Sequence, residues 1–302
     1  MKYVAPSSPL DIGAVLDNWL RLFRASFGGC WAIALLAAVA GALVEYTVTP
    51  RAPMAAGSSL QQYLAYLSAF RGPGVLLPDL ALWLITLVIY GALLAQQAAV
   101  VRGEETLSFG DALAKGLRRL PQMLLGTLLL ILIVLAICIP LGIALAVMLM
   151  LRHSPLAVLL GSLAIVAVVI VLIYVSVRLQ IWMAVMFSEN RGGAASLGRS
   201  WDLVKGHWWR VTGIGFVSGI VISILSWAVG AAIGLVIGVM VIHGTTPDLL
   251  LRRVQLIGAA SQVARLLTMP LLTAVWFAIY QDMRLRREGG DLAARTEALS
   301  GN

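Results

Sequence analysis

Two neighbouring apolar stretches of the chain decide its fold. Residues 122–151 read QMLLGTLLLILIVLAICIPLGIALAVMLML, and residues 155–187 read PLAVLLGSLAIVAVVIVLIYVSVRLQIWMAVMF. A helix needs only about 20 apolar residues to cross the hydrocarbon layer of a membrane, and both stretches are longer than that. The short link between them, residues 152–154, predicts an antiparallel helical hairpin that crosses a membrane twice.

Four further stretches have the same character, so that predicted spans lie near residues 27–48, 75–101, 122–151, 155–187, 211–242 and 256–283. Hydrophobic residues make up 60% of the 302 positions and charged residues 12%, against about 45–50% and about 25% in soluble domains. A soluble domain of this size could not bury so much apolar surface. We therefore predict an all-α, polytopic membrane bundle of six transmembrane helices. It forms one domain over residues 1–283, with a short cytoplasmic tail at residues 284–302.

The basic residues predict the orientation of the spans. The net charge is +8, and most Lys and Arg stand in the N-terminal segment, the second and fourth loops and the C-terminal tail. Cytoplasmic loops carry the excess of positive charge, so both termini are predicted to be cytoplasmic. Arginine far outnumbers lysine, as in GC-rich bacterial genomes, and we predict a bacterial inner membrane. The sequence has no basic run with interleaved aromatic residues, so we predict no nucleic-acid partner.

An amphipathic segment precedes each odd-numbered span, which predicts three cytoplasmic interfacial helices. The predicted apolar faces are Ile12, Leu16, Trp19, Phe23 and Phe27 in the first segment, Phe109, Leu113, Leu117 and Leu120 in the second, and Leu197, Trp201, Val204 and Trp208 in the third. Ser-x-x-Asp sequences at Ser8–Asp11 and Ser108–Asp111 predict capped helix starts. When the segments are overlaid, Gly13, Gly110 and Gly198 coincide. This predicts a threefold repeat of an interfacial helix followed by two spans. The alternative is that the three segments are ordinary amphipathic connectors, alike only because all three lie at the membrane surface.

Seven basic residues on these segments are the predicted contacts with lipid headgroups: Arg21, Arg24, Arg118, Arg119, Arg199, Lys205 and Arg210. A helix with one apolar and one basic face lies in the plane of the headgroups, where arginine meets anionic lipid. Membrane lipids, anionic ones above all, are therefore the predicted partners.

The third amphipathic segment carries a resemblance to a known family. Residues 196–209 read SLGRSWDLVKGHWW, which resembles the signature loop of the glycerophosphoryl diester phosphodiesterase membrane-domain family. The start of the chain, Asp11 to Arg24, is similar to the N-terminal entry of that family. The resemblance implies a six-helix membrane bundle. It does not imply phosphodiesterase activity, because the family takes its name from members with a fused soluble domain, and we find no such segment in this sequence.

Four charged residues lie inside predicted spans, where a charge costs roughly 2.5–3.5 kcal/mol on insertion scales. Glu45, Asp79 and Arg265 share a depth near the outer leaflet, which predicts an ion pair of Arg265 with one of the two acids. Arg178 stands near the cytoplasmic end of the fourth span. It either extends to the inner phosphates, forms a buried ion pair with Glu104–Glu105, or contacts a substrate.

Small residues four positions apart mark the fifth span. Gly215 and Gly219 form one GxxxG pair, and Gly230, Gly234 and Gly238 form a longer ridge. Such spacing lets helices approach closely in lipid. The ridge predicts helix packing, either within the bundle or at a homodimer seam.

No residue pattern predicts catalysis. The three His residues are scattered, neither Cys belongs to a CxxC motif, and we predict no catalytic residue, no metal site and no cofactor. The preferred function is a non-enzymatic membrane module that interacts with lipid or acts as a scaffold for a membrane-protein partner. The alternative is a transporter or lipid flippase whose path is lined by Arg178, Arg265, Glu45 and Pro270. An intramembrane enzyme is the third possibility.

Overall fold

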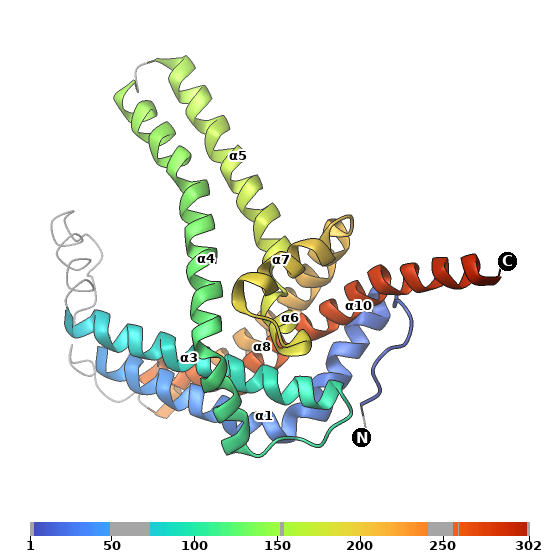
Figure 1. The fold of residues 1–302 in the computed structure, drawn as a ribbon. Coiled ribbons are helices and arrows are strands. Elements are labelled where there is room, and N and C mark those ends of the chain that lie inside the picture. The colour runs from blue at the N-terminus through green and yellow to red at the C-terminus, as the bar shows by residue number, and fades with distance from the viewer. Residues whose placement is uncertain (1–2, 49–72, 152–153, 241–255, 259, 301–302) are drawn as a thin grey trace. The chain divides into compact units, whose positions relative to one another are not determined.

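The computed structural model describes residues 3–48, 73–151, 154–240, 256–258 and 260–300, and within these residues the chain is helical without strands (Figure 1). The helices are α1 (Ile12–Val48), α3 (Pro73–Val101), α4 (Phe109–Met150), α5 (Pro155–Leu179), α6 (Trp182–Glu189), α7 (Gly193–Val204), α8 (Trp208–Met240), the 3-10 turn η1 (Gln262–Ala264) and α10 (Arg265–Ser300).

Six stretches of the described chain are helical, long and apolar enough to cross a membrane. They are Ile12–Val44, Leu77–Val101, Phe109–Met148, Pro155–Glu189, Trp208–Val236 and Leu256–Gly289. Each overlaps one predicted span, so the predicted fold class, an all-α polytopic membrane bundle, is confirmed. Within the predicted tail, α10 continues as a helix to Ser300.

The amphipathic segments differ from the prediction of three separate helices. The first begins α1 and the second begins α4, and both helices continue into the apolar span. Only the third forms a helix of its own, α7. It ends before Lys205, where Gly206 adopts a φ of +85° ahead of α8. Glycine adopts this conformation at low cost. No residue with positive φ interrupts the first two segments, so helix formation propagates through them.

The two predicted helix starts have different outcomes. The Ser108 hydroxyl accepts a hydrogen bond from the Asp111 amide (3.1 Å) and donates one to Asp111 Oδ2 (2.7 Å). This confirms the predicted cap of α4. In α1 the capping residue is Asp11, whose Oδ1 accepts from the Ala14 amide at 2.7 Å, so the helix begins later than the predicted start at Ser8.

The chain divides into two compact units. Unit 1 comprises residues 1–4, 20–118 and 217–274, and unit 2 comprises residues 5–19, 119–216 and 275–302. Four helices, α1, α4, α8 and α10, contain residues of both units.

The core of unit 1 is built from small and medium apolar residues of α1, α3 and α4, with one from α10: Cys30, Ile33, Ala37, Ile89, Ala92, Leu93, Ala112 and Met269. The start of α4 approaches α3 closely at Gly116, where an added Cβ would lie 2.5 Å from the Val88 carbonyl oxygen and 2.8 Å from the Ala92 nitrogen. Backbone-to-backbone packing of this kind is what small residues permit between membrane helices.

Gln96 fixes the connection between α3 and α4. Its Nε2 donates to the carbonyl oxygens of Leu107 (2.7 Å) and Gly29 (3.2 Å), and its Oε1 accepts from the Leu107 amide (2.7 Å). One buried amide thus bonds both polar groups of a loop residue and one carbonyl of α1. Because unsatisfied polar groups are costly in an apolar surrounding, these bonds hold the loop in place.

The apolar face predicted for the second amphipathic segment is buried only in part at the start of α4. Phe109 and Leu117 of that face are 45% and 59% exposed and Leu113 packs against the core of unit 1, while Ala112 and Gly116 are buried. In α1 the buried face is likewise shifted from the predicted one and includes Val15 and Leu22 beside Trp19. Large apolar side chains lose nothing by facing lipid, so small ones are free to occupy the contact between helices.

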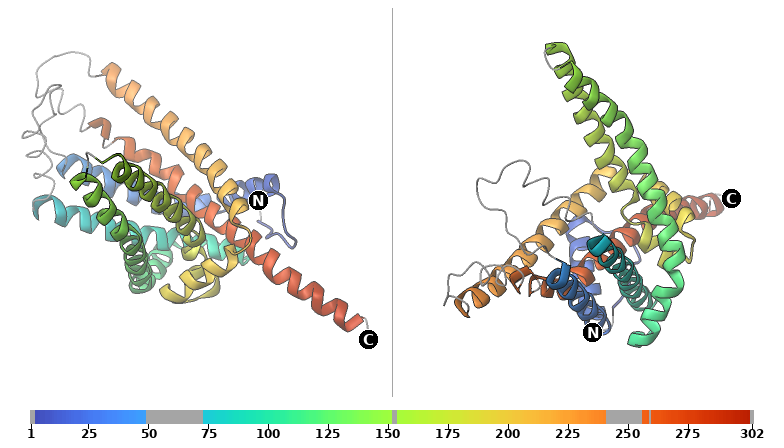
Figure 2. Two further views of the ribbon diagram at one scale, coloured as in Figure 1. Left: turned by 90° about the horizontal axis from the view of Figure 1, so that it is seen from above. Right: turned by 90° about the vertical axis from the view of Figure 1, so that its left-hand side faces the viewer.

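In unit 2, the remainder of α4 and the whole of α5 run side by side in every view (Figure 2). Most residues of α5 are exposed or half-buried, and its buried residues are Gly161, Arg178 and Leu179. At Gly161 an added Cβ would lie 2.7 Å from Met148 Sδ. The helices of this hairpin therefore meet closely at a small residue, and their Leu, Ile and Val side chains point outward, as suits helices in lipid.

Candidate functional site

The buried carboxylate of Asp282, on the part of α10 in unit 2, joins three segments of the chain. Its Oδ2 accepts from Arg210 Nε of α8 (2.8 Å), and its Oδ1 accepts from Arg286 Nε (3.2 Å) and from the Leu10 amide (3.2 Å). Nη2 of Arg210 and Nη2 of Arg286 both donate to the Leu10 carbonyl oxygen, at 2.5 and 2.6 Å. We name these four residues the Asp282 clamp. It fastens the N-terminal segment and the start of α8 to α10.

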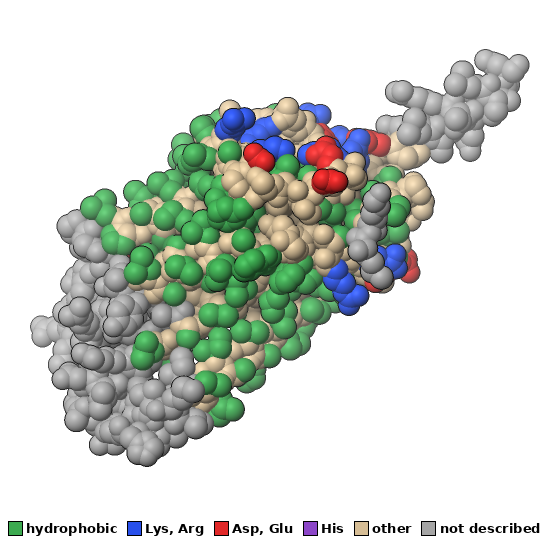
Figure 3. Space-filling model, turned by 90° about the horizontal axis from the view of Figure 1, so that it is seen from below, with side chains coloured by type: hydrophobic (Ala, Val, Ile, Leu, Met, Phe, Trp, Pro, Cys, Tyr) green, Lys and Arg blue, Asp and Glu red, His purple; other side chains and the backbone are tan. Residues whose placement is uncertain are grey.

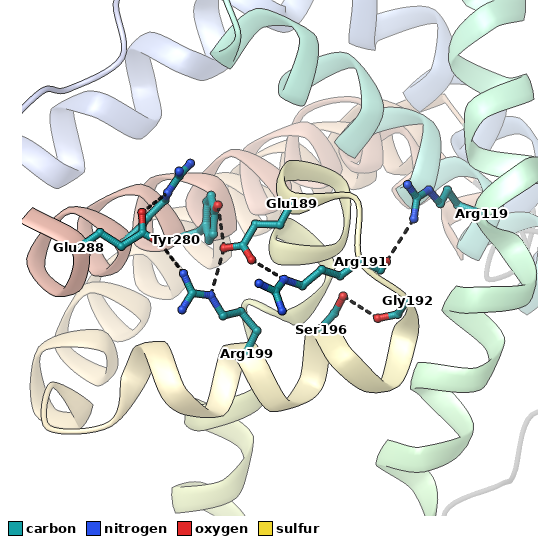
Figure 4. Close-up of polar contacts among 9 residues, drawn as sticks. Arg119, Glu189, Arg191, Gly192, Ser196, Arg199, Tyr280 and Glu288 are labelled. Atoms are coloured by element: carbon teal, nitrogen blue, oxygen red, sulfur yellow. Dashed lines mark hydrogen bonds and ion pairs between the residues drawn. The ribbon is translucent and has the colours of Figure 1, made fainter. Parts of the chain in front are cut away.

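A second polar cluster of unit 2 centres on Glu189, the last residue of α6 (Figure 4). Its Oε2 accepts from Arg191 Nε (2.6 Å), and its Oε1 accepts from Arg199 Nε (3.1 Å) and the Tyr280 hydroxyl (3.2 Å). Arg199 Nη2 also donates to Glu288 Oε1 at 2.5 Å. We name these five residues the Glu189 network. It connects α6, α7 and α10.

The electrostatics of this network keep Arg199 charged. Burial opposes its positive charge, but the hydrogen bonds and negative charges of Glu189 and Glu288 outweigh burial and raise the pKa of the Arg199 guanidinium. Charge-assisted hydrogen bonds of this kind are about twice as strong as neutral ones. Arg199 is therefore bound to protein carboxylates on two helices.

Arg178 lies among aromatic side chains of unit 2 and is 5% exposed. Nη1 donates to the Tyr174 hydroxyl (2.7 Å) and Nη2 to the Trp201 carbonyl (3.0 Å), while Cζ lies 4.1 Å from the centroid of the Trp201 ring. Trp208 stacks on Tyr174, with ring centroids 6.0 Å apart. These contacts favour burial of Arg178 over extension to the phosphates. Glu104, one of its two predicted acidic partners, instead accepts a hydrogen bond from Arg102 (2.6 Å).

Replacing Arg178 by lysine is expected to lower the free energy of unfolding by about 2 kcal/mol. The guanidinium donates in two directions and lies over an indole ring, and an ammonium group cannot reproduce this geometry. The measurement is an SDS titration in mixed micelles, followed by tryptophan fluorescence. The matched control is Arg191→Lys on a half-exposed residue, with an expected change within about 0.5 kcal/mol. Equal stability of the two variants would contradict the role assigned to Arg178.

Among the seven predicted headgroup residues, Arg119, Arg199 and Arg210 donate to groups of the protein. Arg199 and Arg210 pair with carboxylates in the two clusters above. Arg119 Nη1 donates to the Arg191 carbonyl oxygen at 3.1 Å. Figure 3 shows acidic side chains directly beside basic ones, with apolar side chains over most of the rest of the face drawn.

The other four, Arg21, Arg24, Arg118 and Lys205, are exposed. Arg24, Arg118 and Lys205 form no ion pair with any residue that the structure describes. We name these three the outward basic residues. Each stands shortly before an odd-numbered span as predicted from the sequence. Contact with headgroups stays a prediction for all seven residues.

Of the three charged residues predicted near the outer leaflet, the structure describes the side chains of Asp79 and Arg265. The side chain of Glu45 lies outside the described residues, and Asp79 is exposed on α3. Arg265 is partly buried in unit 1, and its Nη1 lies 2.9 Å from where a Cβ on Gly41 would be. The guanidinium thus occupies a notch that Gly41 leaves on α1. Its ion pair with Glu45 or Asp79 stays a prediction.

The glycines of the fifth span are placed on α8. An added Cβ on Gly215 would lie 3.3 Å from Gln180 Nε2, whereas one on Gly219, Gly230 or Gly234 would meet no described atom within 4 Å. Gly238 falls among residues whose side-chain surroundings lie outside the description. Among these glycines, Gly215 therefore lies close to the C-terminal end of α5 at Gln180. The homodimer seam stays a prediction.

Several residues that build these clusters were not singled out from sequence. Asp282 and Glu189 are two of the few acidic residues in a basic chain, and each stands at the end of an apolar stretch. That scarcity was the available signal, because a carboxylate in such a place needs a cationic partner. Among the described residues, no three His, Cys, Asp or Glu side chains are placed to bind one metal ion.

Comparison with known proteins gives one match. No curated protein and no solved structure is significantly similar to the chain. Nothing in the comparisons links it to the glycerophosphoryl diester phosphodiesterase membrane-domain family that its third amphipathic segment resembles. A family profile with the description "Domain of unknown function (DUF7847)" matches residues 31–283, which is most of the chain. The chain therefore belongs to the DUF7847 family.

Proposed function

We propose that this chain is a non-enzymatic protein of the bacterial inner membrane whose outward basic residues bind anionic lipid headgroups. The observation that carries the proposal is the division of the predicted headgroup residues. Arg199 and Arg210 are bound to carboxylates, while Arg24, Arg118 and Lys205 are exposed and free of ion pairs within the described chain.

The position of the outward basic residues supports this proposal. Arg24, Arg118 and Lys205 each precede a span predicted from the sequence, and each belongs to a different copy of the predicted repeat. A basic residue near an anionic leaflet contributes about 1 kcal/mol to lipid attraction. Three such residues, each just before the start of a predicted span, are expected to enrich anionic lipid around the protein. The bias of basic residues toward the same loops supports cytoplasmic termini.

Neutralising the three outward residues together (Arg24→Gln, Arg118→Gln, Lys205→Gln) is expected to remove the selective enrichment of anionic lipid. The protein is extracted in native-lipid discs, and its lipids and co-purifying proteins are identified by mass spectrometry. At about 1 kcal/mol per charge, the three charges together correspond to a loss of about 100-fold in the ratio of anionic to zwitterionic lipid next to the protein.

The matched control removes three arginines from the loops predicted on the opposite side: Arg51→Gln, Arg71→Gln and Arg252→Gln. These lie outside the described residues and change the net charge equally. The proposal holds if the first variant loses the enrichment and the control keeps it. Equal behaviour of the two variants would mean that net charge, rather than the outward residues, attracts the lipid.

A partner protein enriched with the wild-type chain and lost with the first variant would extend the proposal to a scaffold. Bulk-like lipid and no partner in all samples would refute it and favour transport. The observation behind the transport alternative is Arg265, a charge held partly buried in the notch at Gly41 inside a predicted span. Charges inside a membrane commonly mark the path of an ion or substrate.

A further inference from the structure

The Asp282 clamp contains two cationic side chains that converge on one neutral acceptor. Nη2 of Arg210 lies 2.5 Å and Nη2 of Arg286 lies 2.6 Å from the carbonyl oxygen of Leu10. A guanidinium fork matches the oxygens of phosphate or carboxylate, and bonds to an anionic oxygen are stronger than bonds to a peptide carbonyl. The Leu10 oxygen therefore occupies a position that suits an anion.

The charges of the clamp do not balance. It holds two guanidinium groups, of Arg210 and Arg286, against the single carboxylate of Asp282. The carboxylate of the adjacent Asp11 is bonded to the amide of Ala14, at the start of α1. The arginine side chains are 18% and 25% exposed, whereas Asp282 is fully buried. An anion thus has access to the guanidinium groups from outside.

The segment that supplies the carbonyl is weakly attached. Residues 5–10, which we name the N-terminal strap, precede α1 without regular structure and are mostly exposed. Within the described chain, the hydrogen bonds of the strap to other segments are those of Leu10. Pro6 and Pro9 have no amide hydrogen to donate. Loss of the bonds at Leu10 would therefore leave residues 5–10 without a hydrogen bond to another described segment.

We propose that the pair Arg210 and Arg286 is a binding site for an anionic phosphate group, and that phosphate displaces the Leu10 carbonyl and releases the N-terminal strap. This inference rests on the proposed function, since the lipid headgroup is its favoured source of phosphate. Asp282 stays bonded to both arginines and keeps them oriented. The strap then reports the lipid composition around the protein.

Hydrogen–deuterium exchange of the strap amides tests this inference. The full chain is placed in discs of phosphatidylcholine alone, of phosphatidylcholine with phosphatidylglycerol, and of phosphatidylcholine with inorganic phosphate in the buffer. The amides of Ser7, Ser8 and Leu10 are followed, with those of α3 as a check on the fold. Phosphatidylglycerol is expected to speed exchange at Leu10 by about tenfold or more, because each charge-assisted bond is worth at least about that factor.

The Arg286→Gln variant removes one of the two donors to Leu10. Exchange at Leu10 is expected to be about tenfold faster than in the wild type already in phosphatidylcholine, and the further response to phosphatidylglycerol to be lost. Arg287→Gln is the matched control. It removes the next arginine of α10, which forms no ion pair within the described chain, and it should leave exchange and response as in the wild type.

The outcomes separate the two proposals. Faster exchange with phosphatidylglycerol supports a lipid phosphate site, and faster exchange with inorganic phosphate alone assigns the site to free phosphate. Equal exchange in all three discs overturns the inference. If anionic lipid is still enriched by the outward basic residues in that case, the proposed function stands without the strap. If enrichment is absent as well, both proposals fail.

Discussion

Replacing Asp282 by alanine is expected to lower the free energy of unfolding by about 3 kcal/mol. The carboxylate is fully buried and bonded to Arg210, Arg286 and the Leu10 amide. Breaking a buried ion pair by removal of one partner costs roughly 3–5 kcal/mol, because the other charge is left unpaired. The lower end applies, since both guanidinium groups keep part of their surface exposed. The measurement is an SDS titration in mixed micelles followed by circular dichroism.

The control for this prediction is Asp202→Ala, which removes an exposed carboxylate from α7. Surface substitutions of this kind usually change stability by no more than about 0.5 kcal/mol. If the two alanine variants unfold at the same SDS concentration, Asp282 does not join the N-terminal segment, α8 and α10 in the way described above.

The second large effect is expected from Gly116→Ala in unit 1. A Cβ at this position would lie 2.5 Å from the Val88 carbonyl oxygen and 2.8 Å from the Ala92 nitrogen, and both are backbone atoms of α3. The helices would have to move apart, and overpacking of this kind costs about 1–3 kcal/mol. The variant should lose stability by about that amount in the same titration, although alanine is the better helix former.

Gly110→Ala in the same helix gives the opposite expected sign. A Cβ on Gly110 would meet no described atom within 4 Å. Alanine in place of glycine at an unstrained helical position stabilises a protein by about 0.4–1 kcal/mol. A stabilising effect at both positions would show that α3 and α4 do not pack as closely at Gly116 as the structure has them.

The spans were predictable because lipid imposes a simple demand on sequence. A helix that crosses the hydrocarbon layer must be apolar over its length and must satisfy its own backbone, so hydropathy alone marks it. The cap at Ser108 was predictable for a similar reason, since its partner Asp111 stands three residues away. Both features depend on neighbours in sequence.

The inward faces of the helices were not predictable from amphipathicity. In a soluble protein, Phe109 and Leu117 would be expected to face the core, and here they point outward while Ala112 and Gly116 are buried. Lipid removes the penalty for exposed apolar side chains, so the choice of face falls to close packing.

The polar clusters were not predictable because their members lie far apart in sequence. The Leu10 amide donates to Asp282, which stands near the other end of the sequence, and Arg199 of α7 donates to Glu288 of α10. Basic residues near a membrane have two possible partners, lipid phosphate and protein carboxylate. Only the folded chain decides between them, which is why the sequence predicts the same headgroup contact for Arg199 and Arg118.

One long-range feature supports the predicted repeat. Gly29 and Gly126 stand sixteen residues after Gly13 and Gly110, the residues that coincide in the overlay. Each lies under a side chain from another helix: an added Cβ would be 2.4 Å from Gln96 Nε2 at Gly29 and 2.3 Å from Trp182 Cζ3 at Gly126. Two of the three repeat units thus have a glycine in close contact with a side chain of another helix at the corresponding position, whereas the third has Ile214 there.

The central claim is that outward basic residues such as Arg118 attract anionic lipid, whereas Arg199 is held by protein carboxylates and does not. The most direct test measures lipid selectivity and unfolding together for Arg118→Gln and Arg199→Gln, each of which removes one charge. The account predicts that Arg118→Gln reduces anionic-lipid enrichment by about fivefold, for a contribution of about 1 kcal/mol, and leaves unfolding unchanged. It predicts the reverse for Arg199→Gln: earlier unfolding with enrichment kept. The same profile in both variants would contradict the division.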